Sequence, residues 1–253
     1  DNAFRSNNTM YEIGYDAKQL KEDGEHRVGF AMDYMDGSSS FSKVSGSGEV
    51  NRKGLWMYDS WIGEKGHYRD LVAKWGHLSN DFEFMSGAGE TTGEFGNNVY
   101  SVSAEFGKKN DIGNNWYFEP QAQLQYAHVT GSDYVTTMDG ADQTQIRNDA
   151  FNSLIARAGF RIGKDVDARS TVYLKADVMH EFLGEQDVFA NDGTTSGEWA
   201  KASYDHGGTW YDLGFGYSTK LNEASYVYID VETSFGNDYE KTYQINGGVQ
   251  WSF

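Results

Sequence analysis

The sequence has no cysteine and a single proline, Pro120, among its 253 residues. Without cysteine the chain can form neither a disulfide framework nor a thiolate metal site. Chance and export through an oxidising compartment explain this lack equally well. The chain also has no apolar run of about twenty residues, which a helical membrane span would need. One proline and 30 glycines suit strands joined by glycine-containing turns, because proline interrupts hydrogen-bonded ladders.

Positive charge is scarce as well. The chain has 21 Lys and Arg against 38 Asp and Glu, which leaves a formal net charge of −17. Binding nucleic acid through its phosphates needs clustered basic residues, so we expect no nucleic-acid partner. Acidic loops that solvate the protein account for the charge. No Gly-x-Ser-x-Gly or His-Glu-x-x-His spacing occurs either, and we expect no catalytic residue, metal or cofactor in this chain.

Aromatic residues, in contrast, are abundant at 15%, although the mean hydropathy of −0.67 is that of a polar protein. A high aromatic content and a polar mean hydropathy occur together where aromatic and polar residues alternate, as in residues 241–253. Period two indicates a strand, whose apolar face would meet a protein core in a soluble sandwich or lipid in an outer-membrane barrel. The chain ends on this strand with two aromatic residues, which favours the barrel. The apolar face consists of Tyr243, Ile245, Gly247, Val249, Trp251 and Phe253.

The same alternation predicts about eleven strands, at residues 9–19, 27–34, 50–62, 68–75, 99–106, 117–126, 153–162, 172–181, 211–218, 226–232 and 241–253. Short links alternate with mostly long ones, which are residues 36–49, 76–97, 128–152 and 183–209. This asymmetry is typical of an outer-membrane barrel with tight periplasmic turns and long external loops. We therefore predict an all-β fold, an antiparallel transmembrane up-and-down β-barrel, formed as one domain by residues 1–253.

Aromatic residues at the strand ends add to this prediction, because outer-membrane barrels carry aromatic girdles at both interfaces. Core packing would use aromatic residues too, so this feature favours the membrane less strongly than the loop pattern does. The residues concerned are Tyr34, Tyr68, Trp75, Trp116, Tyr126, Tyr211 and Trp251.

The second face of most predicted strands is polar and charged. In residues 117–126 this face carries one Glu and three Gln in succession, and a dry core would leave such groups unpaired at a cost of about 1–3 kcal/mol each. We therefore predict a wet lumen whose wall is formed by Glu12, Asp16, Asp59, Asp70, Glu105, Glu119, Gln121, Gln123, Arg157, Arg161, Asp177, Asp212, Asp230 and Glu232. The wall is either a hydrated set of paired charges or a surface that holds a polypeptide in transit.

Five stretches resemble, in order, the signatures of autotransporter β-domains, the translocators of type V secretion. They are MYEIGYD at 10–16, GLWMY at 54–58, GHYRDL at 66–71, FEPQAQLQY at 118–126 and RAGFRIG at 157–163. The resemblance implies a twelve-stranded barrel in the outer membrane of a Gram-negative bacterium. It also implies that the domain translocates and anchors an N-terminal passenger, with a linker helix in the lumen.

The resemblance further implies that the barrel assembly machinery recognises the last strand, through Tyr243, Ile245, Val249, Trp251 and Phe253, after periplasmic chaperones have delivered the chain. The sequence departs from the family at its start. The polar residues 1–8 are expected to form an external loop, and the first family strand and the linker helix are absent. The odd strand count leaves two edges for another segment or protein to cover, since hydrocarbon does not tolerate unpaired strands.

Two other functions compete with the translocator. An outer-membrane barrel enzyme of protease or lipase type would place catalytic groups at the external rim, where His128 and His206 are the candidates. Loop histidines without a catalytic motif are commonly structural, so this alternative is weaker. A small diffusion porin would need an open lumen, and a twelve-stranded barrel is narrow enough for a helix to plug.

Overall fold

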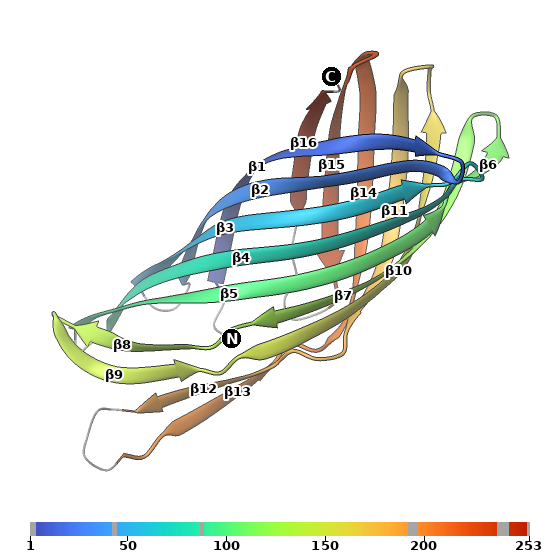
Figure 1. Cartoon of the computed structure of the whole chain (residues 1–253). Helices are drawn as coiled ribbons and strands as arrows, with labels where there is room; N and C mark the ends of the chain where they lie inside the picture. The colour runs from blue at the N-terminus through green and yellow to red at the C-terminus, as the bar shows by residue number, and fades with distance from the viewer. Residues whose placement is uncertain (1–3, 42–44, 87–88, 192–196, 237–242, 252–253) are drawn as a thin grey trace.

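The computed structural model describes residues 4–41, 45–86, 89–191, 197–236 and 243–251. Sixteen strands form one curled antiparallel sheet, and the described residues contain no helix (Figure 1). Accordingly, no helix long and apolar enough to cross a membrane is found in the described part of the chain. The predicted all-β antiparallel fold is confirmed.

Eleven strands follow one another around the sheet and match the eleven predicted from the alternation. Each pairs with its neighbour in antiparallel register, with one irregularity at residues 220–222 between β14 and β15, and we call these strands the wall. They are β1 (Phe4–Lys21), β2 (Gly24–Phe41), β3 (Ser45–Ile62), β4 (His67–Ser86), β5 (Gly89–Lys108), β7 (Trp116–Val129), β10 (Phe151–Asp165), β11 (Ser170–Glu181), β14 (Gly208–Asn222), β15 (Ser225–Phe235) and β16 (Gln244–Trp251).

Five further strands lie in segments predicted to be links or loops. They are β6 (Asn110–Gly113), β8 (Ser132–Met138), β9 (Ala141–Asn148), β12 (Glu185–Asn191) and β13 (Ala200–Asp205). β8 pairs with β5 and β9, β9 pairs with β12, and β12 pairs with β13. Four of these strands therefore continue the sheet beyond the wall, at its end with the long loops, where Figure 1 shows them reaching away from the wall.

The prediction of loops is wrong for two of the long links and for the start of the chain, where the structure has strand. Residues 36–41 and 45–49 continue β2 and β3, residues 76–86 and 89–97 continue β4 and β5, and the described residues 4–8 belong to β1, paired with residues 37–41. Their Gly- and Ser-rich composition has low strand propensity, but the neighbouring ladders supply backbone hydrogen bonds that override it. We call the part of the sheet beyond Tyr34, Lys53, His77 and Asn98, together with β8, β9, β12 and β13, the extension.

The two faces of the wall differ sharply. Ala122 is exposed on the outer face, and Leu124, Leu213, Ile229 and Val249 there are 46–51% exposed. Alternate residues on the inner face are mostly buried or half-buried. Among the described residues only Ala31 and Tyr117 form a buried apolar core. A sheet with exposed apolar side chains outside and no dry core inside is suited to lipid, not to water.

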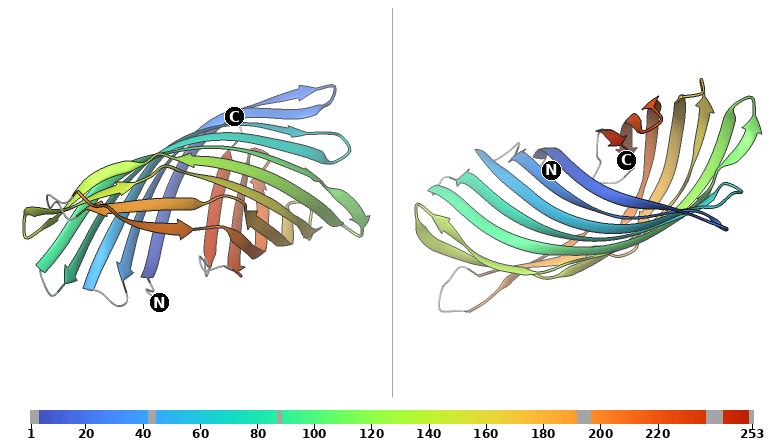
Figure 2. Two further views of the ribbon diagram at one scale, coloured as in Figure 1. Left: turned by 90° about the horizontal axis from the view of Figure 1, so that it is seen from below. Right: turned by 45° about the horizontal axis from the view of Figure 1, so that its top comes forward.

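The sheet does not close on itself in the described residues. β1 pairs only with β2, and β16 pairs only with β15, so an edge is open at each end. Figure 2 shows the result as a trough with the first and last strands on opposite sides. An open edge exposes a row of backbone donors and acceptors, which makes it a site for strand addition.

Candidate functional site: the inner polar wall

Thirteen of the fourteen predicted lumen residues share the inner face. Directly opposite residues on neighbouring strands point to the same side, and the register aligns them in rows across the sheet. One row joins Asp70, Glu105, Gln123 and Arg157 on β4, β5, β7 and β10. The thirteen are Glu12, Asp16, Asp70, Glu105, Glu119, Gln121, Gln123, Arg157, Arg161, Asp177, Asp212, Asp230 and Glu232.

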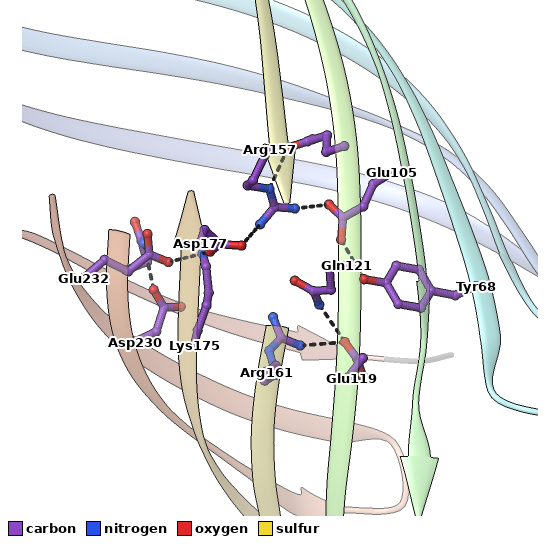
Figure 3. A network of polar contacts seen from close by, with 12 residues as sticks. Tyr68, Glu105, Glu119, Gln121, Arg157, Arg161, Lys175, Asp177, Asp230 and Glu232 are labelled. Carbon is purple, nitrogen blue, oxygen red and sulfur yellow. Dashed lines mark hydrogen bonds and ion pairs between the residues drawn. The ribbon is translucent and has the colours of Figure 1, made fainter. Parts of the chain in front are cut away.

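Arg157 is the centre of the largest network on this face (Figure 3). Its guanidinium donates to Glu105 Oε2 at 2.6 Å and to Gln123 Oε1 at 3.0 Å, and lies 3.4 Å from Asp177 Oδ1. On the far side of Glu105, the Tyr68 hydroxyl donates to Oε1 at 2.7 Å. The planar fork of an arginine suits this bridging of two carboxylates.

Lys175 extends this network to the end of the sheet. Its ammonium donates to Glu232 Oε1 on β15 at 2.8 Å and lies 3.6 Å from Asp177 Oδ2. Side chains from β4, β5, β7, β10, β11 and β15 are thus connected. The side chains of Asp177 and Arg157 are 0% and 12% exposed, so these contacts are screened less than surface ion pairs.

A second group lies nearer the short turns. Gln121 Nε2 donates to Glu119 Oε1 at 2.7 Å, and Arg161 lies 3.6 Å from the same oxygen. The Arg161 guanidinium also covers the ring of Tyr173, 4.5 Å from its centroid. Figure 3 shows both groups on the same inner surface.

The wall reaches both open edges. Near β1, the Tyr58 hydroxyl donates to Asp16 Oδ2 at 2.9 Å, whereas Glu12 is exposed. Near β16, Asn246 Nδ2 donates to Asp230 Oδ1 at 2.8 Å. Polar groups therefore line the inner face from the first strand to the last.

Several buried polar atoms on this face have no hydrogen-bond partner in the described protein. They include Asp177 Oδ2, Asp212 Oδ1 and Gln121 Oε1. Asp212, which is 5% exposed, lies directly opposite Asp177, so two carboxylates face each other. Buried groups of this kind are costly unless water or a ligand satisfies them. The inner face is consequently one that retains water.

Asp59 is the one predicted lumen residue on the wrong face. It lies directly opposite Val28 and Leu71, both exposed on the outer face, and its carboxylate is 3.4 Å from the guanidinium of Arg69 on that same face. Strand β3 is partly apolar on both faces, so the alternation did not settle its orientation. Leu55 and Met57 occupy the outer positions before Asp59.

Sequence reasoning also missed three inner residues. Tyr68, predicted for the aromatic girdle, points inward to Glu105, and Tyr58 points inward to Asp16. Arg52 donates twice to Asp33 Oδ1, at 2.8 and 3.0 Å. Gly54 shares one face of β3 with residues 52 and 58. Assigning that face to the lumen would have identified Arg52 and Tyr58 as inner residues.

The predicted assembly residues lie on the outer face of β16 or just before it. Ile245 and Trp251 are 62% and 61% exposed, Val249 lies between them, and Tyr243 precedes the strand. Phe253 lies outside the described residues. The described side chains among them form an apolar stripe along an edge strand.

The two candidate catalytic histidines are separate. His128 Nδ1 lies 2.9 Å from Asn152 Oδ1, and His206 Nε2 lies 3.4 Å from Gln186 Oε1. No group of three or more His, Asp or Glu suited to a metal ion occurs in the described ranges.

This wall defines a class of protein: a membrane β-barrel with a polar inner face and lipid-facing apolar residues. A family model described as "Autotransporter beta-domain" matches residues 1–232. The chain therefore belongs to the autotransporter β-domain family, whose members are outer-membrane barrels of Gram-negative bacteria. Its end with the short turns accordingly faces the periplasm, and the extension is external.

Curated relatives agree with this family. The chain is 27% identical over 256 residues to "Probable autotransporter YcgV" of Escherichia coli (strain K12), covering 96% of this chain and 25% of that protein. It is 28% identical over 258 residues to "Serine protease pet autotransporter" of Escherichia coli O44:H18, covering 99% of this chain and 19% of that protein. The chain thus spans about a quarter or less of these relatives.

Solved structures show the same fold. The β-domain of the Bordetella autotransporter BrkA has a TM-score of 0.75 at 20% identity, over 99% of this chain and 93% of that one. The translocator domain of NalP from Neisseria meningitidis has a TM-score of 0.78 at 12% identity, over 100% of this chain and 82% of that one.

Proposed function

We propose that this domain translocates a passenger polypeptide, encoded upstream in the same protein, to the cell surface and anchors it in the outer membrane. Family membership supports the proposal, and the continuous polar inner wall is the observation that carries it. A chain in transit needs a surface that keeps water on its backbone groups, because unpaired peptide groups are costly. The alternatives of a barrel enzyme or a diffusion porin are not favoured.

The wall residues act in this function as a hydrated surface on which many of the charges are already paired with one another. Arg157, Lys175 and Arg161 neutralise neighbouring carboxylates, so that no single strong charge holds a passing segment. Gln121 and Gln123 add weaker hydrogen-bonding groups between the ion pairs. We propose the same wall as the surface that contacts the linker helix after transit.

Replacing polar residues by apolar ones on the inner face of one wall strand tests this role. The double substitution Gln121→Leu and Gln125→Leu leaves the ion pairs intact but removes polar groups from the inner face of β7. In the full-length protein we expect passenger arrival at the surface, measured by protease accessibility, to slow roughly tenfold, the equivalent of about 1.4 kcal/mol in the barrier.

A matched control uses the outer face of the same strand. Leu124→Val with Tyr126→Phe changes lipid-facing side chains and should leave arrival unchanged. The heat-resistant gel mobility of the folded barrel must be retained in both variants. Equal arrival rates in folded wild type and inner-face variant would contradict the proposed role of the wall.

We further propose that the barrel assembly machinery recognises Tyr243, Ile245, Val249, Trp251 and Phe253, after periplasmic chaperones have delivered the unfolded chain. An open edge strand with exposed apolar residues suits recognition by strand addition. The domain itself is proposed to be non-catalytic, any enzymatic activity belonging to the passenger. Expressing residues 1–253 without upstream segments and finding hydrolase activity would contradict that assignment.

A further inference from the structure

The Asp59–Arg69 pair is out of place on a lipid-facing surface. Both side chains are on the outer face, 42% and 35% exposed, and their charged atoms are 3.4 Å apart. Asp59 Oδ1 and Arg69 Nε are buried without a hydrogen-bond partner. Charges on the lipid face are costly at the membrane midplane and far less so near its surface. Both charged side chains remain partly exposed at this position, so a polar group of a ligand outside the barrel can reach them.

The surroundings of Arg69 become more basic towards the periplasmic turns. His67 and Lys108 lie directly opposite each other on β4 and β5, in the outer-facing register one step beyond Arg69 and Phe106. Three residues that can carry positive charge therefore face outward together at the periplasmic surface. An anionic phosphate is the complementary group.

A shallow apolar hollow begins where these charges end. Its volume is about 610 Å³, within the range of about 300–1,000 Å³ typical of small-ligand sites. Its floor is formed by two small residues, Ala73 on β4 and Ala104 on β5. Larger outer-face side chains surround them: Val28, Met57, Leu71, Val102, Leu124 and Tyr126.

The order of these features along a strand matches the order of groups in a phospholipid. On β5, the outer-facing positions run from Lys108 through Phe106 to Ala104, a distance of about 13 Å for four residues. The polar end lies at the periplasmic surface and the apolar hollow lies deeper in the membrane. A second copy of this chain would present a broad wall, whereas the charges here are confined to one end of a narrow hollow.

We propose that this surface binds one phospholipid of the periplasmic leaflet. Arg69, with His67 and Lys108, holds the phosphate, and Asp59 orients the Arg69 guanidinium through their ion pair. One acyl chain occupies the hollow over Ala73 and Ala104. This site is distinct from the inner wall and rests only on the membrane location of the domain.

Photo-crosslinking tests the proposal. The full-length protein is reconstituted in vesicles of phosphatidylethanolamine and phosphatidylglycerol that contain phosphatidylethanolamine with a diazirine in one acyl chain. Cross-linked peptides are then mapped by mass spectrometry. We expect enrichment at residues 71–73 and 102–104 over residues 174 and 213–215 of roughly tenfold, the effect of one hydrogen bond to a charged group.

Two variants remove the two parts of the site. Ala104→Phe fills the hollow, and Arg69→Leu removes the phosphate partner; each should reduce the enrichment to near background. Arg69→Lys keeps the charge and should retain most of it. Ala158→Phe, at an outer-facing alanine outside the lining of the hollow, and Lys53→Leu, where β3 passes from the wall into the extension, are the matched controls and should leave it unchanged.

Folding is checked by heat-resistant gel mobility, and only folded variants are compared. Uniform labelling around the barrel would mean ordinary surrounding lipid and would overturn the proposal. Lipid adducts that are depleted at residues 71–73 and 102–104 relative to residues 174 and 213–215 would mean that this surface is covered by protein and would overturn it as well. Enrichment that survives both Arg69→Leu and Ala104→Phe would show that these residues do not form the site.

Discussion

The wall and the external extension use the same strands with opposite faces apolar. In the wall, the outer face carries exposed apolar residues such as Met32 and Leu124, and the inner face is charged. In the extension, the outer face is acidic, with Glu49, Asp81 and Glu94 directly opposite one another on β3, β4 and β5.

The inner face of the extension, by contrast, is aromatic. The rings of Phe95 and Tyr134 stack with centroids 4.8 Å apart, and Phe82 lies 6.1 Å from Tyr134. β4 and β5 pass from one environment to the other without a break. The contrast shows that surroundings, lipid or water, set which face is apolar, while backbone pairing continues regardless.

The largest expected effect distinguishes the terminal edge from the strands inside the sheet. Trp251→Asp, or deletion of Phe253, should reduce membrane insertion by roughly tenfold or more, because it removes a side chain that the assembly machinery is proposed to read. Tyr100→Asp and Leu174→Asp, at positions of similar outer exposure, should cost much less. Insertion is measured by the fraction of protein with folded gel mobility. Similar losses at all three positions would make the last strand an ordinary one.

The second largest expected effect is the loss of unfolding free energy when an ion pair is broken, which should differ between the wall and the extension. Arg157→Leu leaves Asp177 and Glu105 without their shared cation in the inner wall, at an expected cost of about 3–5 kcal/mol in unfolding free energy. Arg147→Leu breaks the exposed pair with Asp133 in the extension and should cost about 0–1 kcal/mol.

Urea unfolding in detergent or lipid, followed by gel mobility, measures both variants. The comparison fails if the two substitutions destabilise the barrel equally. Arg157→Lys, which retains the charge but loses the fork, should fall between them.

A smaller effect is expected from the aromatic residues. Tyr134→Ala removes the ring that stacks on Phe95 and should open the extension locally, at a cost of about 1–3 kcal/mol. Phe160→Ala removes an outer ring of the wall, 5.5 Å from Phe118, but lipid can fill the space. Hydrogen exchange of residues 132–148 should accelerate in the first variant alone. Acceleration spread over the wall strands would show that the extension is not a separate unit.

The sequence was sufficient to predict the wall. Period-two alternation located all eleven of its strands, and of the fourteen residues predicted for the lumen only Asp59 lies on the opposite face, although Arg52, Tyr58 and Tyr68 were missed. The error at Asp59 has a physical cause, because Asp59 and Arg69 form an ion pair on the outer face. A single charged residue near the end of a strand does not show which face of the sheet it occupies unless its partner is known. The identity of the partner depends on the register of β3 and β4.

The extension could not be predicted in the same way. Residues 36–49 combine glycine and serine with scattered charges, a composition that indicates a loop. Residues 36–41 and 45–49 form strand because β2 and β3 are already aligned from Glu25 and Ile62 onwards, and each added pair extends a ladder. The joining of β9 to β12, from loops 40 residues apart, is a long-range contact with no local signal.

The smallest effect is a pH response confined to the extension. The Asp187 carboxylate on β12 accepts from Lys201 Nζ at 2.8 Å and from Ser203 Oγ at 2.6 Å on β13, and these contacts lower its pKa below the ordinary 3.8. A lowered folded-state pKa means that the stabilisation is fully present above 3.8 and is lost as the pH falls through the folded value. The Asp187 side chain is partly exposed, so screening by solvent keeps the effect small. Hydrogen exchange across β12 and β13 should therefore accelerate below about pH 4, once the intrinsic pH dependence of exchange is removed.

Asp187→Asn should abolish this acceleration, and the wall strands should not share it. An unchanged pH profile in Asp187→Asn would show that the β12–β13 pairing does not depend on this carboxylate.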